Sequence, residues 1–228
     1  MTMQQGAASI GQGCGWNRFS AVLRKAVQDF GDGLTFFGRW LRNPAHIASV
    51  APSGRALAAL ITREIDGTMG AVLELGSGTG AFVPALLRRG IGEHALTLVE
   101  RDPALARLLA RRYPRAAVLN LDAANVARLA GDASFGAVVC GLGLRNMRQH
   151  EIEAILRASL AVMKPGAAFY LFTYGPRCSV PADSLDRLGL DVRRIGATWR
   201  NLPPAAVYRI LRRPRPTVID MTMGSDGS

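Results

Sequence analysis

The sequence predicts an α/β protein with a doubly wound sheet and a helical N-terminal extension. From about residue 70 onward, short apolar runs alternate with helical patterns, which is typical of repeated β-α units. The runs are apolar on both faces, as expected for parallel strands that helices cover on both sides. Two extended segments around residues 201–204 follow the last unit, and we expect them to add a hairpin to the sheet edge.

The elements follow in order from these patterns. Strands are expected at residues 71–75, 95–100, 116–121, 135–142 and 168–173. Helices are expected between them, at residues 81–89, 103–113, 124–129 and 149–163. Pro103 suits a first helical turn, because its missing N–H would have no partner there. Lys164, Pro165 and Gly166 form a helix stop before the fifth strand. The hairpin is expected from residues 191–200 and 205–213.

The composition excludes several classes of protein. The three cysteines are widely spaced and have no histidine at ligand spacing, which argues against a zinc or disulfide scaffold and fits a reducing cytoplasm. We therefore expect no metal site. No apolar run reaches 18 residues, the length that would indicate a membrane span. Lys and Arg number 28 against 17 Asp and Glu, and the net charge of +11 favours an anionic partner, either a lipid surface or nucleic acid.

A glycine loop follows the first expected strand. Glu74 ends that strand, and Gly76, Gly78 and Gly80 then lead into a helix. The spacing differs from the G-x-G-x-x-G of dinucleotide-binding folds, and an acidic residue beside the loop would repel a pyrophosphate. Such a residue suits a cationic ligand, for example a sulfonium or an α-ammonium group. The loop therefore predicts a small-molecule site for a cation.

Two further acidic residues follow the next strands. Glu100 closes the second strand, where a carboxylate can accept hydrogen bonds from two ribose hydroxyls. Asp122 follows the third strand, where the exocyclic amine of an adenine would lie. In this arrangement residues 74–80 resemble the first motif of the class I S-adenosylmethionine-dependent methyltransferases. Glu100 resembles the ribose-binding acid of that superfamily, and Asp122 with Ala123 its adenine-contacting pair.

This resemblance covers roughly residues 50–212 and implies a seven-stranded sheet whose last two strands form the hairpin. It also implies S-adenosylmethionine as cofactor and S-adenosylhomocysteine as product. The residues that it assigns to the cofactor are Ser53, Glu74, Gly76, Ser77, Gly78, Thr79, Gly80, Glu100, Arg101, Asp122, Ala123, Gly141 and Leu142.

A narrower resemblance lies outside these motifs. Residues 37–44, 50–53, 172–177 and 199–208 resemble segments of the bacterial phospholipid N-methyltransferases. Enzymes of that family methylate the amine of phosphatidylethanolamine up to three times and so form phosphatidylcholine. The resemblance implies the same activity here, on an anionic membrane surface. It places the protein in the cytoplasm, peripherally attached to the inner face of the cell membrane.

Methyl transfer to a neutral amine creates a cation, which aromatic faces can stabilise. Tyr174 is the best aromatic candidate, Asn146 can orient the amine through its side-chain carbonyl, and His46 can accept a proton. Arg177 can pair with the lipid phosphate, with a plain surface arginine as the alternative. The other candidate substrate-binding residues are the aromatic residues Trp40, Trp199 and Tyr208. Trp199 and Tyr208 have an alternative role, which is to pack the edge hairpin.

The chain divides into four expected parts. Residues 1–15 and 216–228 are expected to be disordered, 16–50 to form amphipathic helices, and 51–215 to form the methyltransferase domain. Apolar residues from Phe19 to Phe30 recur along one helical stripe, with Arg24 and Lys25 beside it. Such a helix can lie in a membrane interface and cap the substrate. Alternatively, the stripe packs on the catalytic domain as ordinary core.

Other functions remain open at this point. An adenine-N6 methyltransferase acting on RNA shares the fold, the cofactor and the positive charge. Such enzymes resemble one another in an Asn/Asp-Pro-Pro-Tyr/Phe loop after the fourth strand, whereas residues 141–147 here hold no proline or aromatic residue. We therefore expect no nucleic-acid partner. An ornithine-lipid amine is a further alternative acceptor. A non-catalytic membrane-binding module is disfavoured by the intact Glu74, Glu100 and Asp122.

Late arginines carry much of the positive charge near the C-terminal end. They can face anionic lipid headgroups or an RNA backbone, and composition does not separate the two. They are Arg193, Arg194, Arg200, Arg209, Arg212, Arg213 and Arg215.

Overall fold

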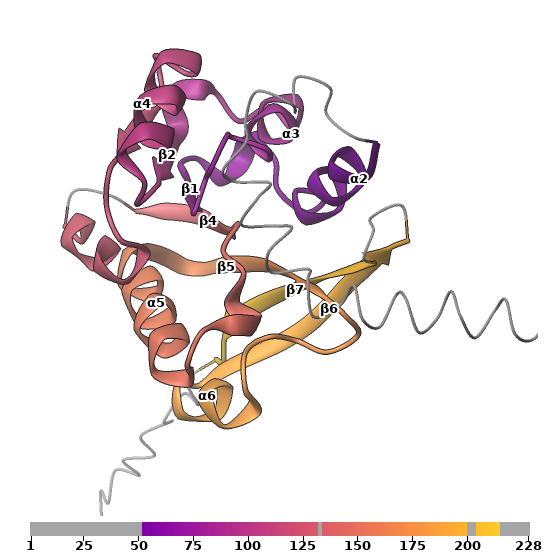
Figure 1. Ribbon diagram of the computed structural model, residues 1–228. Coiled ribbons are helices and arrows are strands. Elements are labelled where there is room, and N and C mark those ends of the chain that lie inside the picture. The colour runs from indigo at the N-terminus through magenta and orange to yellow at the C-terminus, as the bar shows by residue number, and fades with distance from the viewer. Residues whose placement is uncertain (1–51, 132–133, 200–203, 215–228) are drawn as a thin grey trace, which may run out of the picture. The chain divides into compact units, whose positions relative to one another are not determined.

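The computed structural model describes residues 52–131, 134–199 and 204–214 (Figure 1). The chain divides into two units, Met1–Ser49 and Val50–Ser228, and these residues belong to the second. The expected extension at 16–50 and both expected disordered ends lie outside the described residues.

A seven-stranded sheet forms the centre of the described part of the chain, in the order β3-β2-β1-β4-β5-β7-β6. The strands are β1 (Val72–Leu75), β2 (Leu96–Val99), β3 (Ala117–Leu119), β4 (Phe135–Cys140), β5 (Met163–Tyr174), β6 (Leu190–Thr198) and β7 (Ala205–Arg212). Only β7 runs antiparallel to its neighbours in this sheet. The predicted doubly wound fold and its terminal hairpin are therefore confirmed.

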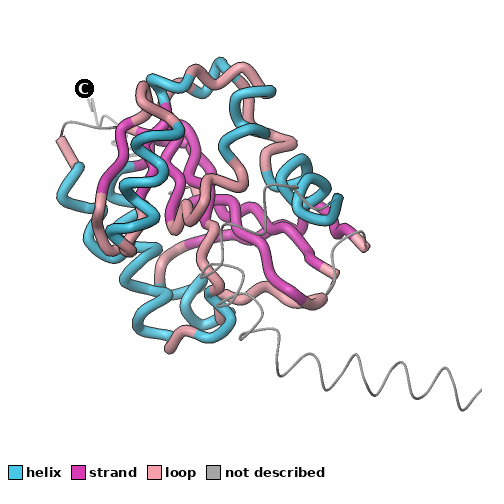
Figure 2. The backbone as a smooth tube through the Cα atoms, turned by 45° about the horizontal axis from the view of Figure 1, so that its top comes forward, coloured by secondary structure: helices cyan, strands magenta, loops and turns pink. Residues whose placement is uncertain are grey.

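Helices cover both faces of the sheet. They are α2 (Pro52–Ile61), α3 (Val83–Arg88), α4 (Pro103–Arg112), α5 (Gln149–Val162) and α6 (Ala182–Arg187). Figures 1 and 2 show α2, α3 and α4 on one side and α5 and α6 on the other. Short 3-10 turns connect the elements, namely η2 (Gly67–Met69), η3 (Glu93–Ala95), η4 (Ala123–Leu129) and η5 (Leu144–Asn146). None of the helices described is long and apolar enough to span a bilayer.

Local chemistry explains where the helices begin and end. Asp102 caps α4, because its carboxylate accepts hydrogen bonds from the backbone N–H groups of Ala104 (2.7 Å) and Leu105 (3.1 Å). Glu151 in the first turn of α5 accepts the backbone N–H of Arg148 at 2.7 Å. That helix ends at Val162, two residues before Lys164, as the stop signal predicts.

The main core lies between the sheet and α5. Ile152, Ile155 and Leu156 of this helix are buried in one apolar cluster with Val138 of β4 and Leu171 of β5. At about 25 cal/mol per Å² of buried apolar surface, such a cluster supplies the main driving force for folding. It fixes the strands whose carboxyl ends carry the candidate site.

Several details differ from the expectations. The segment expected as a helix at 124–129 is the 3-10 turn η4, and β5 begins at Met163 instead of 168. The sequence patterns do not indicate α2 or α6. With six residues, α6 is too short to show a periodic stripe, and α2 has no acidic residue in its first turn.

Candidate active site

The candidate site lies at the carboxyl edge of the sheet. From β1 the chain winds through β2 and β3 to one side and then through β4 and β5 to the other. Ligands of doubly wound folds bind outside the strand ends at such a topological switch. Here the switch falls between β1 and β4, where the glycine loop meets Gly141 and Leu142.

The glycine loop is held in a shape that only glycine can take. Gly76, Gly78 and Gly80 have φ angles of 65°, 56° and 81°, which lie in the left-handed region. A Cβ atom on Gly76 would stand 2.4 Å from Leu142 Cδ2, and one on Gly141 would stand 2.7 Å from the carbonyl oxygen of Gly76. The loops after β1 and β4 are therefore packed backbone to backbone.

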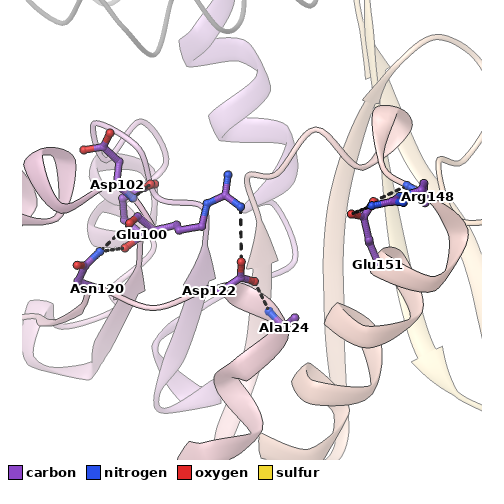
Figure 3. Close-up of polar contacts among 8 residues, drawn as sticks. Glu100, Asp102, Asn120, Asp122, Ala124, Arg148 and Glu151 are labelled. Carbon is purple, nitrogen blue, oxygen red and sulfur yellow. Dashed lines mark hydrogen bonds and ion pairs between the residues drawn. The ribbon is translucent and has the colours of Figure 1, made fainter.

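Glu100 connects the glycine loop to the end of β2. Its Oε2 accepts the backbone N–H of Gly78 and its Oε1 accepts that of Asp102, both at 2.8 Å. The side chain of Asn120 donates to the backbone carbonyls of Glu100 (2.9 Å) and Arg101 (2.8 Å), as Figure 3 shows. Each carboxylate oxygen keeps a further lone pair, so Glu100 can still accept hydrogen bonds from a ligand. No motif in the sequence singles out Asn120.

Asp122 begins η4 beyond the end of β3. Its Oδ1 accepts the backbone N–H of Ala124 at 2.9 Å, and its Oδ2 lies 3.6 Å from the guanidinium of Arg101 (Figure 3). The Arg101 side chain is 82% exposed, so this ion pair contributes little to stability. Ala123 is buried beside it. The hydrogen bond to Oδ1 thus fixes the carboxylate of Asp122, while Oδ2 makes the longer contact with Arg101.

Glu74 is the most unusual group at this edge. The residue is 1% exposed, and its Oε2 has no hydrogen-bond partner among the described residues. Burial, and then the nearby charge of Glu100, raise the pKa of Glu74 to about 8. Since the described residues offer this oxygen no partner, a ligand would have to supply one, and a cationic ligand would suit an ionised carboxylate best.

The remaining residues of the loop serve its geometry. The hydroxyl of Ser77 donates to the carbonyl of Glu74 at 3.2 Å, and the carbonyl of Thr79 accepts from the Arg112 guanidinium at 3.3 Å. A ligand with a positive group, vicinal hydroxyls and an exocyclic amine therefore fits the groups that Glu74, Glu100 and Asp122 present.

Tyr174 ends β5 at the same edge and is half-buried. Its ring packs edge-on against the Phe172 ring, with 5.5 Å between the ring centroids. Phe172 packs in the same way against Phe82, with 6.0 Å between the centroids. Arg145, in the loop after β4, donates to the backbone carbonyl of Tyr174. Burial raises the pKa of the Tyr174 hydroxyl, so the ring stays neutral. Phe82, Phe172 and Arg145 were not among the predicted residues.

The residues predicted to bind substrate take different places. The Tyr208 side chain is buried, and its hydroxyl donates to the carbonyl of Pro176, which is the packing role left open by the sequence. Arg177 lies next to Pro176 in the loop that this hydrogen bond holds, and it is exposed. Trp199 follows β6 and is 81% exposed. The residue before it, Thr198, pairs in register with Ala205 of β7, which in turn pairs with Tyr174 of β5. Asn146 is exposed at the end of η5.

Several predicted residues lie outside the described part of the chain. They are Phe19, Arg24, Lys25, Phe30, Trp40 and His46, together with the side chain of Ser53. Of the late arginines, Arg193 and Arg209 pair with Glu64 (2.8 and 3.1 Å), and Arg213 pairs with two aspartates. These ion pairs offset part of the positive charge. In the described ranges no group of three or more His, Cys, Asp or Glu side chains is placed to hold a metal ion.

The chain is similar to known methyltransferases. Residues 72–166 match a family model described as a methyltransferase domain. The chain is 28% identical over 184 residues to an ornithine lipid N-methyltransferase of Singulisphaera acidiphila, a match that covers 78% of this chain and 94% of the relative.

Two solved structures share the fold. A glycopeptide N-methyltransferase, MtfA, in complex with S-adenosylmethionine matches with a TM-score of 0.57 and 15% identity, over 72% of this chain and 96% of its own. The 1,6-didemethyltoxoflavin-N1-methyltransferase of Burkholderia thailandensis matches with a TM-score of 0.55 and 16% identity, over 91% of this chain and 93% of its own.

Proposed function

We propose that this chain, an S-adenosylmethionine-dependent methyltransferase of the class I fold, methylates the amine of phosphatidylethanolamine at a membrane surface, successively to phosphatidylcholine. The observation that carries the proposal is the loop after β5. It places a half-buried aromatic ring, Tyr174, three residues from an exposed guanidinium, Arg177, at the carboxyl edge. Similarity to a lipid N-methyltransferase supports the choice of a lipid amine.

The residues at the carboxyl edge fit the cofactor. Bound S-adenosylmethionine supplies a methyl group on a sulfonium, which a neutral amine can displace. Glu74 would face a positive group of the cofactor, Glu100 would accept hydrogen bonds from the ribose hydroxyls, and Asp122 would accept one from the adenine amine. Because Glu100 and Asp122 are already held by backbone N–H groups, they need little reorganisation to bind.

Tyr174 would stabilise the positive charge that grows on the acceptor nitrogen. An aromatic face attracts a cation by about 0.5–2 kcal/mol, more when the site is desolvated. Edge-on contact with Phe172 and the hydrogen bond from Arg145 to the Tyr174 carbonyl hold this residue in place. The ring is also suited to successive rounds, since each methylation keeps the cationic character of the product.

Arg177 would bind the phosphate of the headgroup. In phosphatidylethanolamine the phosphate is only a few bonds from the amine, and a guanidinium grips phosphate through two parallel hydrogen bonds. No acidic side chain among the described residues forms an ion pair with Arg177. The hydrogen bond from Tyr208 to the Pro176 carbonyl fixes the loop that carries it. A phospholipid acceptor therefore matches this edge.

An ornithine lipid is the second candidate acceptor, and the similarity to the relative of Singulisphaera acidiphila favours it. Its amine would use the same aromatic face. An ornithine lipid has no phosphate, but it carries a free α-carboxylate, which a guanidinium also binds through two hydrogen bonds. Arg177 alone therefore does not separate the two acceptors, and each lipid has to be supplied as the sole acceptor.

The test compares wild type, Arg177→Ala and Arg128→Ala on vesicles that contain either lipid, with labelled S-adenosylmethionine. Arg128 is a matched control, exposed on η4 away from the β5 loop. We expect Arg177→Ala to raise KM for phosphatidylethanolamine by about tenfold, because a charge-assisted hydrogen bond is worth roughly 1.5–3 kcal/mol. Both activities of Arg128→Ala should stay at wild-type level, and methylation of phosphatidylethanolamine when it is the sole acceptor supports it as the substrate. Wild-type KM for phosphatidylethanolamine in Arg177→Ala, or an equal loss in Arg128→Ala, would contradict the assignment of Arg177.

A further inference from the structure

Glu74 sits in an apolar layer of the sheet. In register it lies between Leu98 of β2 and Val139 of β4, both fully buried. Residues in register on neighbouring strands point to the same face, so the carboxyl group shares its face with these aliphatic side chains. Its sequence neighbours Leu73 and Leu75 belong to the core cluster on the opposite face. A carboxyl group in this layer is removed from water on every side.

Among the described residues, no group compensates this burial. In that part of the chain the Oε2 atom has no hydrogen-bond partner, and no lysine or arginine side chain forms an ion pair with Glu74. The groups that act on it are Glu100 from the end of β2 and the Tyr113 hydroxyl at the end of α4. Glu100 repels a second negative charge, and Tyr113 itself has an unpartnered hydroxyl. Arg112, next to Tyr113 in the chain, is engaged with the Thr79 carbonyl and the Tyr113 ring.

These contacts favour the neutral acid as long as the site holds no cation. An uncompensated ionised carboxylate in an apolar layer is far less stable than the protonated form. Burial and Glu100 together raise the pKa of Glu74 to about 8, in agreement with the contacts. A cation in contact with the group reverses this balance, because it stabilises only the ionised form.

We propose that Glu74 is a neutral carboxylic acid in the free protein and becomes a carboxylate when S-adenosylmethionine binds, so that each binding event releases one proton. The O–H bond of Glu74 breaks, the proton passes to the buffer, and the carboxylate stays opposite a cationic group of the ligand. That group is either the sulfonium or the α-ammonium of the cofactor. This inference rests on the cofactor of the proposed function and is independent of which acceptor is methylated.

The sign of the pH dependence follows from this linkage. Below about pH 8, binding must remove a proton from Glu74, so affinity rises by about tenfold for each pH unit as the pH increases. Above that value Glu74 is already ionised in the free protein, and its contribution to the pH dependence of affinity ends. The pH dependence of cofactor affinity that Glu74 causes is absent when the residue at position 74 cannot ionise.

Calorimetry of the full chain tests the proposal. S-adenosylmethionine is titrated at about pH 7 in two buffers with different ionisation enthalpies, and the difference in heat gives the protons released. We expect about one proton per cofactor in wild type, none in Glu74→Gln, and wild-type release in Glu151→Gln, whose exposed carboxyl group only caps α5. The wild-type titration is decisive even if Glu74→Gln does not fold.

A second arm uses S-adenosylhomocysteine, which lacks the sulfonium charge but keeps the α-ammonium. Release with both ligands identifies the ammonium as the partner of Glu74, and release with S-adenosylmethionine alone identifies the sulfonium; either result supports the proposal. Binding of S-adenosylmethionine to wild type without proton release would overturn it, as would equal release by Glu74→Gln. Failure to bind the cofactor at all would instead contradict the proposed function.

Discussion

Glu74 shows what can and cannot be deduced from a single residue. The glycine spacing and the acid before it predict a cationic ligand, because each residue type has a direct chemical reason to stand there. The unpartnered oxygen of Glu74 has no signal in the sequence, since it depends on neighbours from two other strands. Asn120 and Arg145 could not be predicted from the sequence for a related reason. Each fixes a distant backbone carbonyl, and such contacts follow no local pattern.

The stability of the free protein should depend on Glu74 and pH. The carboxyl pKa is raised from 4.5 to about 8 by folding, so the folded state holds a proton that the unfolded state loses. The stabilisation is fully present below about pH 4.5 and is lost as pH rises to about 8, by an amount on the order of a few kcal/mol. Denaturant unfolding of wild type and Glu74→Gln across this range measures the effect. A wild-type curve that matches the variant at every pH would contradict it.

Gly141 and Gly143 form a matched pair for the contact between the loops. A Cβ on Gly141 would meet the backbone of Gly76 at 2.7 Å, whereas one on Gly143 would meet nothing within 4 Å. We expect Gly141→Ala to destabilise the protein by about 1–3 kcal/mol and to weaken cofactor binding, because backbone cannot move aside cheaply. Gly143→Ala should leave both properties within about 0.5 kcal/mol of wild type. Thermal unfolding with and without S-adenosylhomocysteine distinguishes the two, and equal behaviour would contradict the packing described.

At the scale of elements, the sheet follows closely from the sequence, and the helices follow less closely. Apolar runs predict β1 to β5, because strands that helices cover on both faces are largely hydrophobic. The hairpin strands β6 and β7 follow instead from the two extended segments around residues 201–204, and most residues of β6 are not buried. By contrast, α2 has no predicted counterpart. Its position depends on contacts beyond its end, where Arg63 donates to the Ile195 carbonyl at 2.8 Å and Glu64 pairs with Arg193 and Arg209. Tertiary contacts of this kind leave no periodic trace.

Glu64 should be the residue that fastens α2 to the β6–β7 hairpin. Its carboxylate bridges two guanidinium groups, and the Arg209 side chain is only 30% exposed. Because removing one member of a partly buried network leaves the others unpaired, we expect Glu64→Gln to reduce the free energy of unfolding by about 1–3 kcal/mol. Arg157→Ala removes a side chain that is 60% exposed and lies 3.9 Å from Glu153. It should change the free energy of unfolding by less than about 0.5 kcal/mol, because Glu153 keeps Arg187 and Ser184 as partners. Similar values for the two variants would show that α2 is held by its apolar face alone.

On the scale of the whole molecule, the net charge is the basis for the proposed anionic partner. The net charge of +11 predicts an anionic surface, and the fold neutralises part of the late arginine cluster through Glu64, Asp186 and Asp191. The net charge follows directly from the composition, but this internal pairing does not, since it depends on which strands become neighbours. The aromatic and basic residues of the N-terminal segment, from Phe19 to Phe30, remain the predicted contact with lipid.

Removal of residues 1–30 should therefore separate membrane binding from cofactor binding. The shortened chain loses the amphipathic stripe and its flanking cations, and we expect its sedimentation with anionic vesicles to fall several-fold, at about 1 kcal/mol for each basic residue removed. Its affinity for S-adenosylhomocysteine should be unchanged, since Glu74, Glu100 and Asp122 are retained. Equal sedimentation of the two proteins would contradict a lipid-binding role for this segment.

The central claim is that the acceptor is a lipid amine, and product analysis tests it most directly. The full chain is incubated with S-adenosylmethionine carrying a deuterated methyl group, with vesicles of phosphatidylethanolamine and anionic lipid, and with structured RNA in a parallel reaction. Mass spectrometry should find the label in mono-, di- and trimethylated phosphatidylethanolamine and none in RNA. Label in RNA alone would contradict the account and would assign the arginines to a nucleic-acid surface.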